Sequence, residues 1–115
     1  MGLTYFQSWA LAFAITQIVE MPIYRVLAPV RWRRAFALSL VTHPVVWYAI
    51  PPLCESAGLR YAQTLWIAES FAYVVEAAML RAWGVRWWRA IAVSAVANTA
   101  SFAIGEFVRT AWGVP

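Results

Sequence analysis

The sequence contains no aspartate and no lysine, so its five acidic residues are all Glu and its nine basic residues are all Arg. Charged residues make up only 12% of the chain, whereas apolar residues make up 63%. Soluble domains carry about 25% charged residues, so this chain has too few charges to cover a solvated surface. The same apolar content excludes an intrinsically disordered chain. With 115 residues, the composition indicates a single membrane-embedded domain, residues 1–115.

Cysteine and histidine are equally scarce, since the chain has one residue of each. A single cysteine, Cys54, excludes an internal disulfide framework and a cysteine-based zinc cluster. The sequence also lacks a GxSxG element, a Gly-rich phosphate loop and an aspartate pair, so it predicts neither an enzyme nor a cofactor. The pI of about 9.8 does not indicate nucleic-acid binding, because most of the arginines sit in two short turns, where membrane orientation explains them.

Four apolar stretches are long enough to be membrane spans, which need roughly 20 residues each to cross about 30 Å of hydrocarbon. They are predicted at residues 3–24, 35–50, 61–80 and 90–108. The second is the shortest and contains Pro44, so a kink or a local widening of the helix is expected there. A cleaved signal peptide is the alternative for the first stretch, but residues 1–7 contain no Arg or Lys. The predicted fold is therefore an all-α membrane protein with four transmembrane helices.

The arginines are divided unevenly between the two sides of such a bundle. Seven arginines follow the first and third spans: Arg25, Arg31, Arg33, Arg34, Arg81, Arg86 and Arg89. The opposite side has two, Arg60 and Arg109. Short loops rich in Arg stay in the cytoplasm. We therefore expect a bacterial inner-membrane protein with both termini outside, and with loop 51–60 and its Cys54 also outside. Trp and Tyr residues fall at both expected interfaces, which agrees with this orientation.

The second half of the chain repeats the first at an offset of about 55 residues. With one gap at Pro29, the aligned pairs include Glu20 and Glu76, Arg25 and Arg81, Trp32 and Trp87, and Ser39 and Ser94. Chance matching of abundant Ala, Val and Arg is the alternative, but Glu, Trp and Ser in the same order favour a duplication. Each copy, about residues 3–50 and 61–108, is predicted to be a helical hairpin. A unit with two crossings repeats in one orientation, so we expect tandem hairpins in a parallel repeat about the membrane normal.

Each predicted span carries one polar stripe at helical spacing, so the four stripes are expected to face a shared interior. Counting about 1.5 Å per residue from the arginines places Glu20, Ser39, Ser94 and Glu76 in one layer. We interpret this symmetric layer as structural. The carboxyl groups are expected to bond arginines of the neighbouring hairpin, or serines, and so to fix the register of the helices.

A second polar layer, nearer the middle of the membrane, holds His43, Asn98 and Glu69. It is asymmetric, because the repeat partner of Glu69 is Phe13. No Arg lies within one turn of Glu69, so it must be protonated, paired with His43 or Tyr73, or in contact with a bound ion. His43 as an ordinary core residue stays an open alternative. A His and Glu set could also bind a divalent metal, but no HxxxH or similar spacing accompanies His43 to support one. The candidate proton or cation site therefore comprises His43, Glu69, Glu76, Asn98 and Tyr73.

Two functions are compatible with these features. A buried Glu that takes up and releases a proton is typical of coupled transporters, so the leading hypothesis is a transporter or channel-type bundle for a small solute or ion. The alternative is a non-catalytic structural or accessory subunit of a larger membrane complex that binds lipid, pigment or partner helices. Four helices can hardly enclose a substrate path, and Ala97, Ser101 and Gly105 form a small-residue seam. We therefore expect a homo-oligomer or a partner membrane protein, surrounded by membrane lipid.

Overall fold

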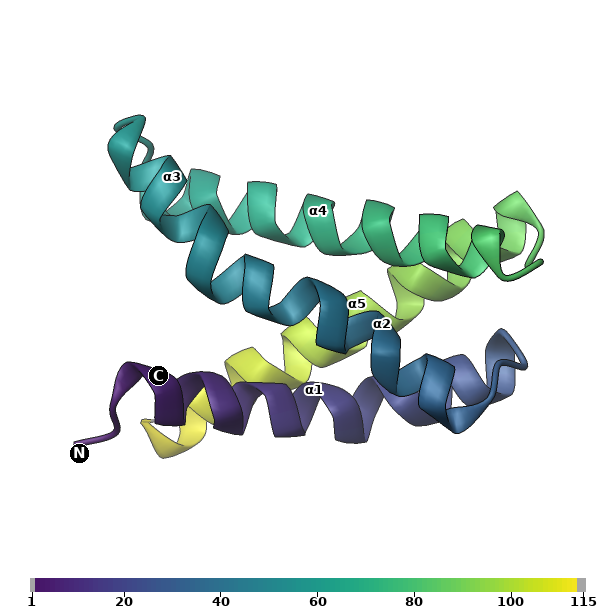
Figure 1. Ribbon diagram of the computed structural model, residues 1–115. Coiled ribbons are helices and arrows are strands. Elements are labelled where there is room, and N and C mark those ends of the chain that lie inside the picture. Colours follow the sequence, from purple (N-terminus) through teal and green to yellow (C-terminus); the bar gives the residue numbers. More distant parts are fainter. Residues whose placement is uncertain (1, 114–115) are drawn as a thin grey trace.

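The computed structural model describes residues 2–113, and the only regular elements within them are helices. Helix α1 spans Tyr5–Leu27 and α2 spans Trp32–Pro44, after which a π-helical turn, η1 (Val45–Ala49), leads into the short α3 (Ile50–Ser56). Helix α4 spans Tyr61–Ala82 and α5 spans Trp87–Trp112. Because α2, η1 and α3 follow one another without a break, these elements form four long rods (Figure 1).

The four rods are arranged as two hairpins, α1 with α2 and α4 with α5. The hairpins pack together through α1 against α5 and through α2 against α4. Residues 28–31 and 83–86, the two tight turns, lie at one end of the bundle, whereas both termini and the turn between α3 and α4 lie at the other (Figure 1). Gly84 closes the second tight turn at φ +99°, a left-handed conformation that favours glycine.

The core lies mainly towards the end that holds the tight turns. Side chains from all four rods meet there without exposure to solvent: Tyr24, Leu38, Leu80 and Ala90. A smaller cluster nearer the other end packs Ile50 and Cys54 of α3 against Ala68 of α4. The only cysteine is therefore a buried packing residue, 6% exposed.

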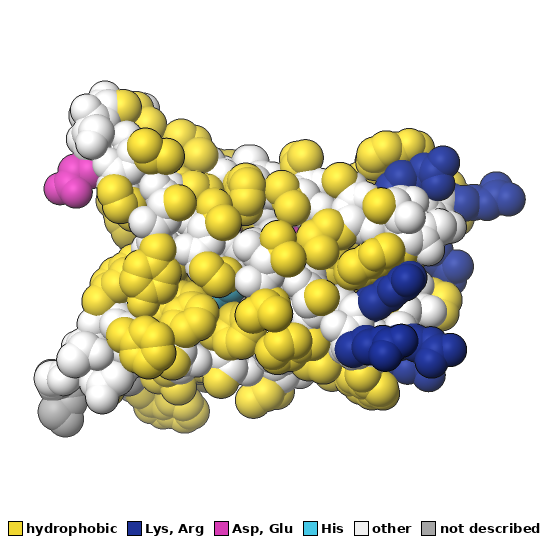
Figure 2. Space-filling model, viewed as in Figure 1, with side chains coloured by type: hydrophobic (Ala, Val, Ile, Leu, Met, Phe, Trp, Pro, Cys, Tyr) yellow, Lys and Arg dark blue, Asp and Glu magenta, His cyan; other side chains and the backbone are white. Residues whose placement is uncertain are grey.

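Three of the rods are long and apolar enough to cross a membrane: α1, the continuous segment Trp32–Ser56, and α5. At three of the four predicted spans the structure thus has a helix of the required length and apolar content. Helix α4 is also long, with 22 residues, but it carries Glu69, Glu76 and Arg81. Figure 2 shows apolar side chains along the length of the visible face and the arginines gathered at one end. That is the segregation expected from the sequence.

Pro44 widens the helix where the sequence predicted a kink or a widening. Proline has no N–H group, so it cannot donate to the carbonyl one turn earlier. The backbone continues past Pro44 as the π turn η1, in which the Ile50 N–H donates to the Val45 carbonyl. The π turn confirms the prediction of a local widening.

The prediction of a loop over residues 51–60 is wrong for most of that length. The helix continues through α3 to Ser56, and the turn proper covers residues 57–60. Pro51 and Pro52 are compatible with this, because they occupy the first turn of α3, where helices tolerate a missing N–H.

Candidate functional site

Two carboxyl groups lie in the interior of the bundle. Glu20 of α1 and Glu76 of α4 are each 1% exposed, and they are electrostatic neighbours of each other. They occupy the positions that the internal alignment pairs. Burying a carboxyl group is costly unless hydrogen bonds and a neutralising partner accompany it, so the surroundings of this pair decide what it can do.

Glu76 accepts hydrogen bonds from three neutral side chains. The Tyr24 hydroxyl donates to Oε1 and the Thr42 hydroxyl donates to Oε2, both at 2.5 Å. The Asn98 side-chain amide donates to Oε1 at 3.1 Å. Tyr24 and Thr42 belong to the first hairpin, so the hydroxyl groups that hold Glu76 come from across the interface between the hairpins.

Glu20 is held in a complementary way. Ser39, on the same hairpin, donates to Oε1 at 2.7 Å, and Ser101 of α5 donates to Oε2. Each carboxyl group therefore receives a hydroxyl group from the opposite hairpin. The carboxyl site, as we call it below, consists of the two carboxyl groups and their five donors: Glu20, Glu76, Tyr24, Ser39, Thr42, Asn98 and Ser101.

Two of the donors have a second acceptor within reach. Thr42 Oγ1 lies 3.2 Å from the Leu38 carbonyl oxygen, and Ser101 Oγ lies 3.2 Å from the Asn98 carbonyl oxygen. A hydroxyl group has one proton to donate and two lone pairs that accept. Each of these hydroxyl groups can therefore turn its proton to the backbone and present a lone pair to the neighbouring carboxyl group.

Arginine does not reach the carboxyl site. Within residues 2–113 the one ion pair joins Arg109 Nη2 to Glu106 Oε1 at 2.6 Å, on the surface of α5. The expectation that Glu20 and Glu76 bond arginines of the neighbouring hairpin is therefore wrong, whereas the expected serine contact is present at Glu20. The arginines instead gather at the end of the bundle (Figure 2). The site consequently lacks a fixed positive charge.

Asn98 and Ser94 form a connected pair on α5. The Asn98 amide that reaches Glu76 also lies 2.9 Å from the Ser94 carbonyl oxygen. Ser94 itself does not bond a carboxyl group, since its hydroxyl donates to the Tyr73 carbonyl oxygen at 2.8 Å. Ser94 thus ties α5 to α4 and helps to orient Asn98.

His43 lies on the side of α2 that faces α1. Its Nε2 is 3.4 Å from the Thr16 hydroxyl oxygen, and its Nδ1 is buried without a hydrogen-bond partner. Three aromatic rings surround the imidazole, those of Trp9, Phe13 and Trp47. His43 is therefore part of an aromatic cluster and not of the carboxyl site.

Glu69 and Tyr73 also lie outside the carboxyl site. Glu69 is half-buried on α4, and among residues 2–113 it forms neither the expected pair with His43 nor an ion pair. The Tyr73 hydroxyl bonds to Thr99 of α5 at 2.5 Å. Of the five residues predicted as a proton or cation site, the structure thus brings together Glu76 and Asn98.

Tyr24, Thr42 and Ser101 complete the site, although sequence reasoning did not assign them to it. A signal for each was present, because Tyr24 follows Glu20 by four residues, which places both on one face of a helix. Thr42 follows Ser39, and Ser101 follows Asn98, at the equivalent spacing of three. Extending the polar stripes of the first two spans by up to one turn would have found Tyr24 and Thr42, whereas Ser101 already lies on the polar stripe of the fourth span.

The polar groups that line the carboxyl site are carboxyl and hydroxyl oxygens and one side-chain amide, that of Asn98. Within the described part of the chain, no group of three His, Cys, Asp or Glu side chains is placed to hold a metal ion. Carboxylate and hydroxyl oxygens bind protons and hard cations in preference to soft metals. A hollow of about 60 Å³ between α1 and α5, lined in part by Thr16 and Ser101, offers space for a few water molecules beside the site.

Comparisons of this chain with protein-family models, with curated proteins and with solved structures found no match.

Proposed function

We propose that this chain is a small inner-membrane protein of bacteria that crosses the membrane four times, with both termini outside. Helix α4 qualifies as the fourth span because Glu76 is buried among the other helices and Glu69 is half-buried. The arginine-rich turns would face the cytoplasm, since positive loops are retained there. The termini, at the opposite end of the bundle (Figure 1), would then be outside.

The burial pattern supports a duplicated hairpin. Six aligned pairs are buried in both halves: Glu20 and Glu76, Tyr24 and Leu80, Ala35 and Ala90, Leu38 and Val93, Ser39 and Ser94, and Thr42 and Ala97. The helix contacts have the same symmetry, because α1 against α5 corresponds to α4 against α2. Both observations favour two tandem hairpins related by a two-fold axis along the membrane normal.

The function that this geometry supports best is uptake of a proton or a small cation by the carboxyl site, in a transporter or channel-type bundle. The observation that carries the proposal is a pair of neighbouring carboxyl groups, each 1% exposed, whose partners are all neutral. Two adjacent carboxylates repel each other strongly where the dielectric constant is low. Hydroxyl and amide donors reduce that cost, but only a proton or a bound cation neutralises the charge.

The hydroxyl groups suggest how the site accepts its occupant. When Thr42 and Ser101 turn their protons to the backbone carbonyls 3.2 Å away, their lone pairs can accept a carboxyl proton or coordinate a cation. Glu69 lies two turns from Glu76 on the same face of α4, about 10 Å along the axis. Being half-buried, Glu69 is placed to relay protons, through water, between Glu76 and the outer part of the bundle.

The proposal is tested by ion flux into vesicles. The purified chain is reconstituted in liposomes that contain a dye selective for H⁺, Na⁺ or K⁺, and flux is started by a gradient of the same ion. Glu76→Gln keeps the size and the hydrogen-bonding capacity of the side chain but cannot become charged. We expect Glu76→Gln to lower flux to the level of protein-free vesicles, whereas the control Glu55→Gln, at an exposed position of α3, retains wild-type flux.

Two results would contradict the proposal. One is wild-type protein that moves none of the three ions faster than protein-free vesicles. The other is a folded Glu76→Gln variant with wild-type flux, because the carboxyl site would then be dispensable.

The alternative, an accessory subunit, is favoured by the outer surface. Small residues pack inside the bundle, since Ala97 of the predicted seam is buried, as are Ala68 and Ala72 of α4. Large aromatic side chains instead point outwards, with Trp66 76% exposed and Phe107 68% exposed. These would meet lipid, pigment or partner helices. Native mass spectrometry of gently solubilised membranes distinguishes the two readings, because an accessory subunit leaves the membrane bound to a larger protein.

A further inference from the structure

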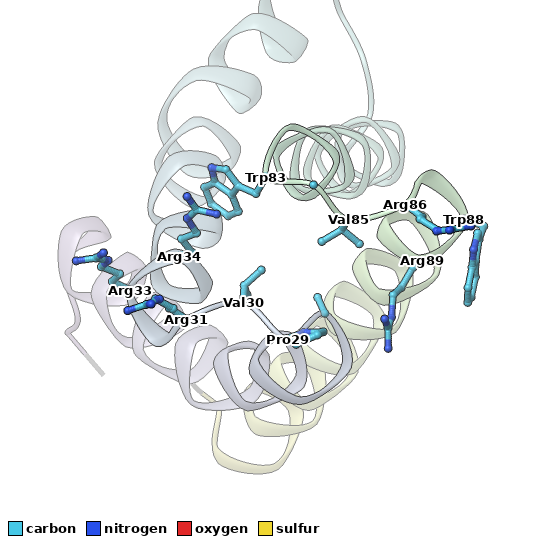
Figure 3. Close-up of a pocket in the computed structure, with 12 residues that line it drawn as sticks. Pro29, Val30, Arg31, Arg33, Arg34, Trp83, Val85, Arg86, Trp88 and Arg89 are labelled. Atoms are coloured by element: carbon cyan, nitrogen blue, oxygen red, sulfur yellow. The ribbon is translucent and has the colours of Figure 1, made fainter.

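An open hollow of about 840 Å³ lies at the end of the bundle that holds the two tight turns. We call it the arginine hollow, and its walls are residues of the segments 28–34 and 83–89. Figure 3 looks into this end, and shows Val30, Val85 and Trp83 around the central opening, with Arg34 beside Trp83 and the other arginines further out. The hollow thus has an apolar centre and a cationic rim.

The charge of the arginine hollow is entirely positive. Five arginines line it, with no acidic residue among the lining side chains: Arg31, Arg33, Arg34, Arg86 and Arg89. The single ion pair in residues 2–113 lies elsewhere, on α5. Arg34 is held over the ring of Trp83, with its guanidinium carbon 5.0 Å from the ring centre. The rim therefore presents guanidinium groups that no carboxylate of the described chain neutralises.

Backbone dipoles add to the arginines. Helices α2 and α5 both begin at the hollow, after Arg31 and Arg86, and neither N-terminus has a side-chain cap or an acidic residue in its first turn. The N-terminal N–H groups of a helix carry partial positive charge and favour anions. Two helix N-termini and five arginines thus make this end of the bundle positive, with the side chains of Arg31, Arg33, Arg86 and Arg89 extending outward from the rim of the opening (Figure 3).

Membrane orientation alone does not explain this arrangement. Retention of a loop in the cytoplasm requires positive charge but no particular shape. Here the charges lie around the rim of a hollow, and four of the five come from equivalent positions of the two hairpins, Arg31 with Arg86 and Arg34 with Arg89. We propose that the arginine hollow binds a phosphate-bearing anion, held by guanidinium groups in the fork geometry that suits phosphate oxygens.

Two sources of phosphate fit the site. One is the headgroup of an anionic phospholipid, because in the orientation proposed above the hollow lies at the level of the inner headgroups, beside the apolar Val30 and Val85. The other is a soluble phosphate compound of the cytoplasm. Both would use the same arginines, so the experiment has one arm for each source.

The lipid arm uses the full chain in detergent with added phosphatidylglycerol or zwitterionic phosphatidylcholine, and native mass spectrometry counts the lipids retained. The soluble arm titrates inorganic pyrophosphate by calorimetry. The test variant is Arg31→Gln with Arg86→Gln, which removes the arginines that precede α2 and α5. The control variant is Arg60→Gln with Arg109→Gln, which removes two arginines that do not line the hollow.

We expect retention of phosphatidylglycerol over phosphatidylcholine, binding of pyrophosphate, or both, according to the source. The test variant should weaken that binding by roughly tenfold or more, about 1.4 kcal/mol, because it removes charge-assisted hydrogen bonds to phosphate oxygens. The control variant should bind like wild type. The proposal is overturned if neither probe binds, or if both double variants lose binding equally, since net charge would then account for it. All four arginines are exposed, and an unchanged circular dichroism spectrum verifies folding.

Discussion

At the scale of single residues, Glu76 depends on helices that are distant in the sequence. Its two shortest bonds come from Tyr24 and Thr42, 52 and 34 residues away along the chain. A buried acceptor has lost its hydrogen bonds to water, so removal of a protein donor leaves that loss uncompensated. Each of these hydroxyl groups therefore stabilises the contact between the hairpins. Their contribution is modest, because polar bonds between membrane helices contribute about 0.6 kcal/mol on average.

The first prediction concerns Thr42, which is 2% exposed. Thr42→Val keeps the shape of the side chain but removes the donor to Glu76 Oε2, so we expect the free energy of unfolding to fall by about 0.6–1.7 kcal/mol. Unfolding in mixed detergent, followed by circular dichroism, measures this. Thr110→Val, at an exposed position of α5, is the matched control and should change stability by less. Equal stability of Thr42→Val and wild type would show that this bond contributes nothing.

At the scale of helices, one backbone carbonyl group near the junction of η1 and α3 has no backbone N–H group to accept from. The Trp47 carbonyl would receive the N–H of residue 51 in an α-helix, or of residue 52 in a π-helix, and both are prolines. The Tyr5 hydroxyl of α1 donates to this carbonyl oxygen instead. Tyr5 also packs its ring against Trp47 and Tyr48. One side chain of α1 thus supplies the hydrogen bond that the irregular part of the second rod lacks.

The second prediction is that Tyr5→Phe destabilises the bundle although it keeps the ring. The Trp47 carbonyl would lose its partner, and we expect a cost of about 1 kcal/mol in the free energy of unfolding. Tyr48→Phe is the control, because Tyr48 contacts Tyr5 and Trp9 through its ring. Chemical unfolding of the three proteins compares them. If the two variants are equally stable, the hydroxyl of Tyr5 has no special role.

At the scale of the whole molecule, the bundle has two chemically different ends. Seven of the nine arginines lie in the tight turns or in the helix ends that flank them, within residues 25–34 and 81–89. This end of the bundle lies opposite the termini and the α3–α4 turn (Figure 1). Labelling of Cys54 alone is a poor test of orientation, because this thiol is buried against Ile50 and Ala68. A test of orientation therefore needs a cysteine introduced at an exposed position next to Cys54.

The third prediction places such reporters at both ends. With Cys54→Ala as background, Glu55→Cys should react with a membrane-impermeant maleimide in intact spheroplasts, because α3 would face outwards. Arg33→Cys, in the first tight-turn region, should react only after permeabilisation. Both positions are exposed, so access across the membrane decides the result. The reverse pattern would invert the proposed topology, and labelling at both positions would disprove a single orientation.

Most of the architecture follows from the sequence by itself. Length and apolar content predict helical spans, Pro44 predicts the widened turn after α2, and the clustered arginines predict one positive end. These features depend on neighbours along the chain, where the helix geometry of about 1.5 Å and 100° per residue holds without knowledge of other helices. The extension of the second helix into α3 escaped prediction because Pro51 and Pro52 suggest a loop, whereas in the first turn of a helix they are tolerated.

The membership of the carboxyl site was decided only by tertiary structure. Thr42 and His43 are adjacent on α2, yet Thr42 meets Glu76 of α4 and His43 meets Thr16 of α1. Successive residues of a helix point about 100° apart, so a small rotation of the helix decides which of them faces which neighbour. That rotation is set by how all four rods pack together, including the register shift of one residue that a π turn introduces. Periodicity along the sequence identifies a polar stripe, but the partners across the interior depend on this packing.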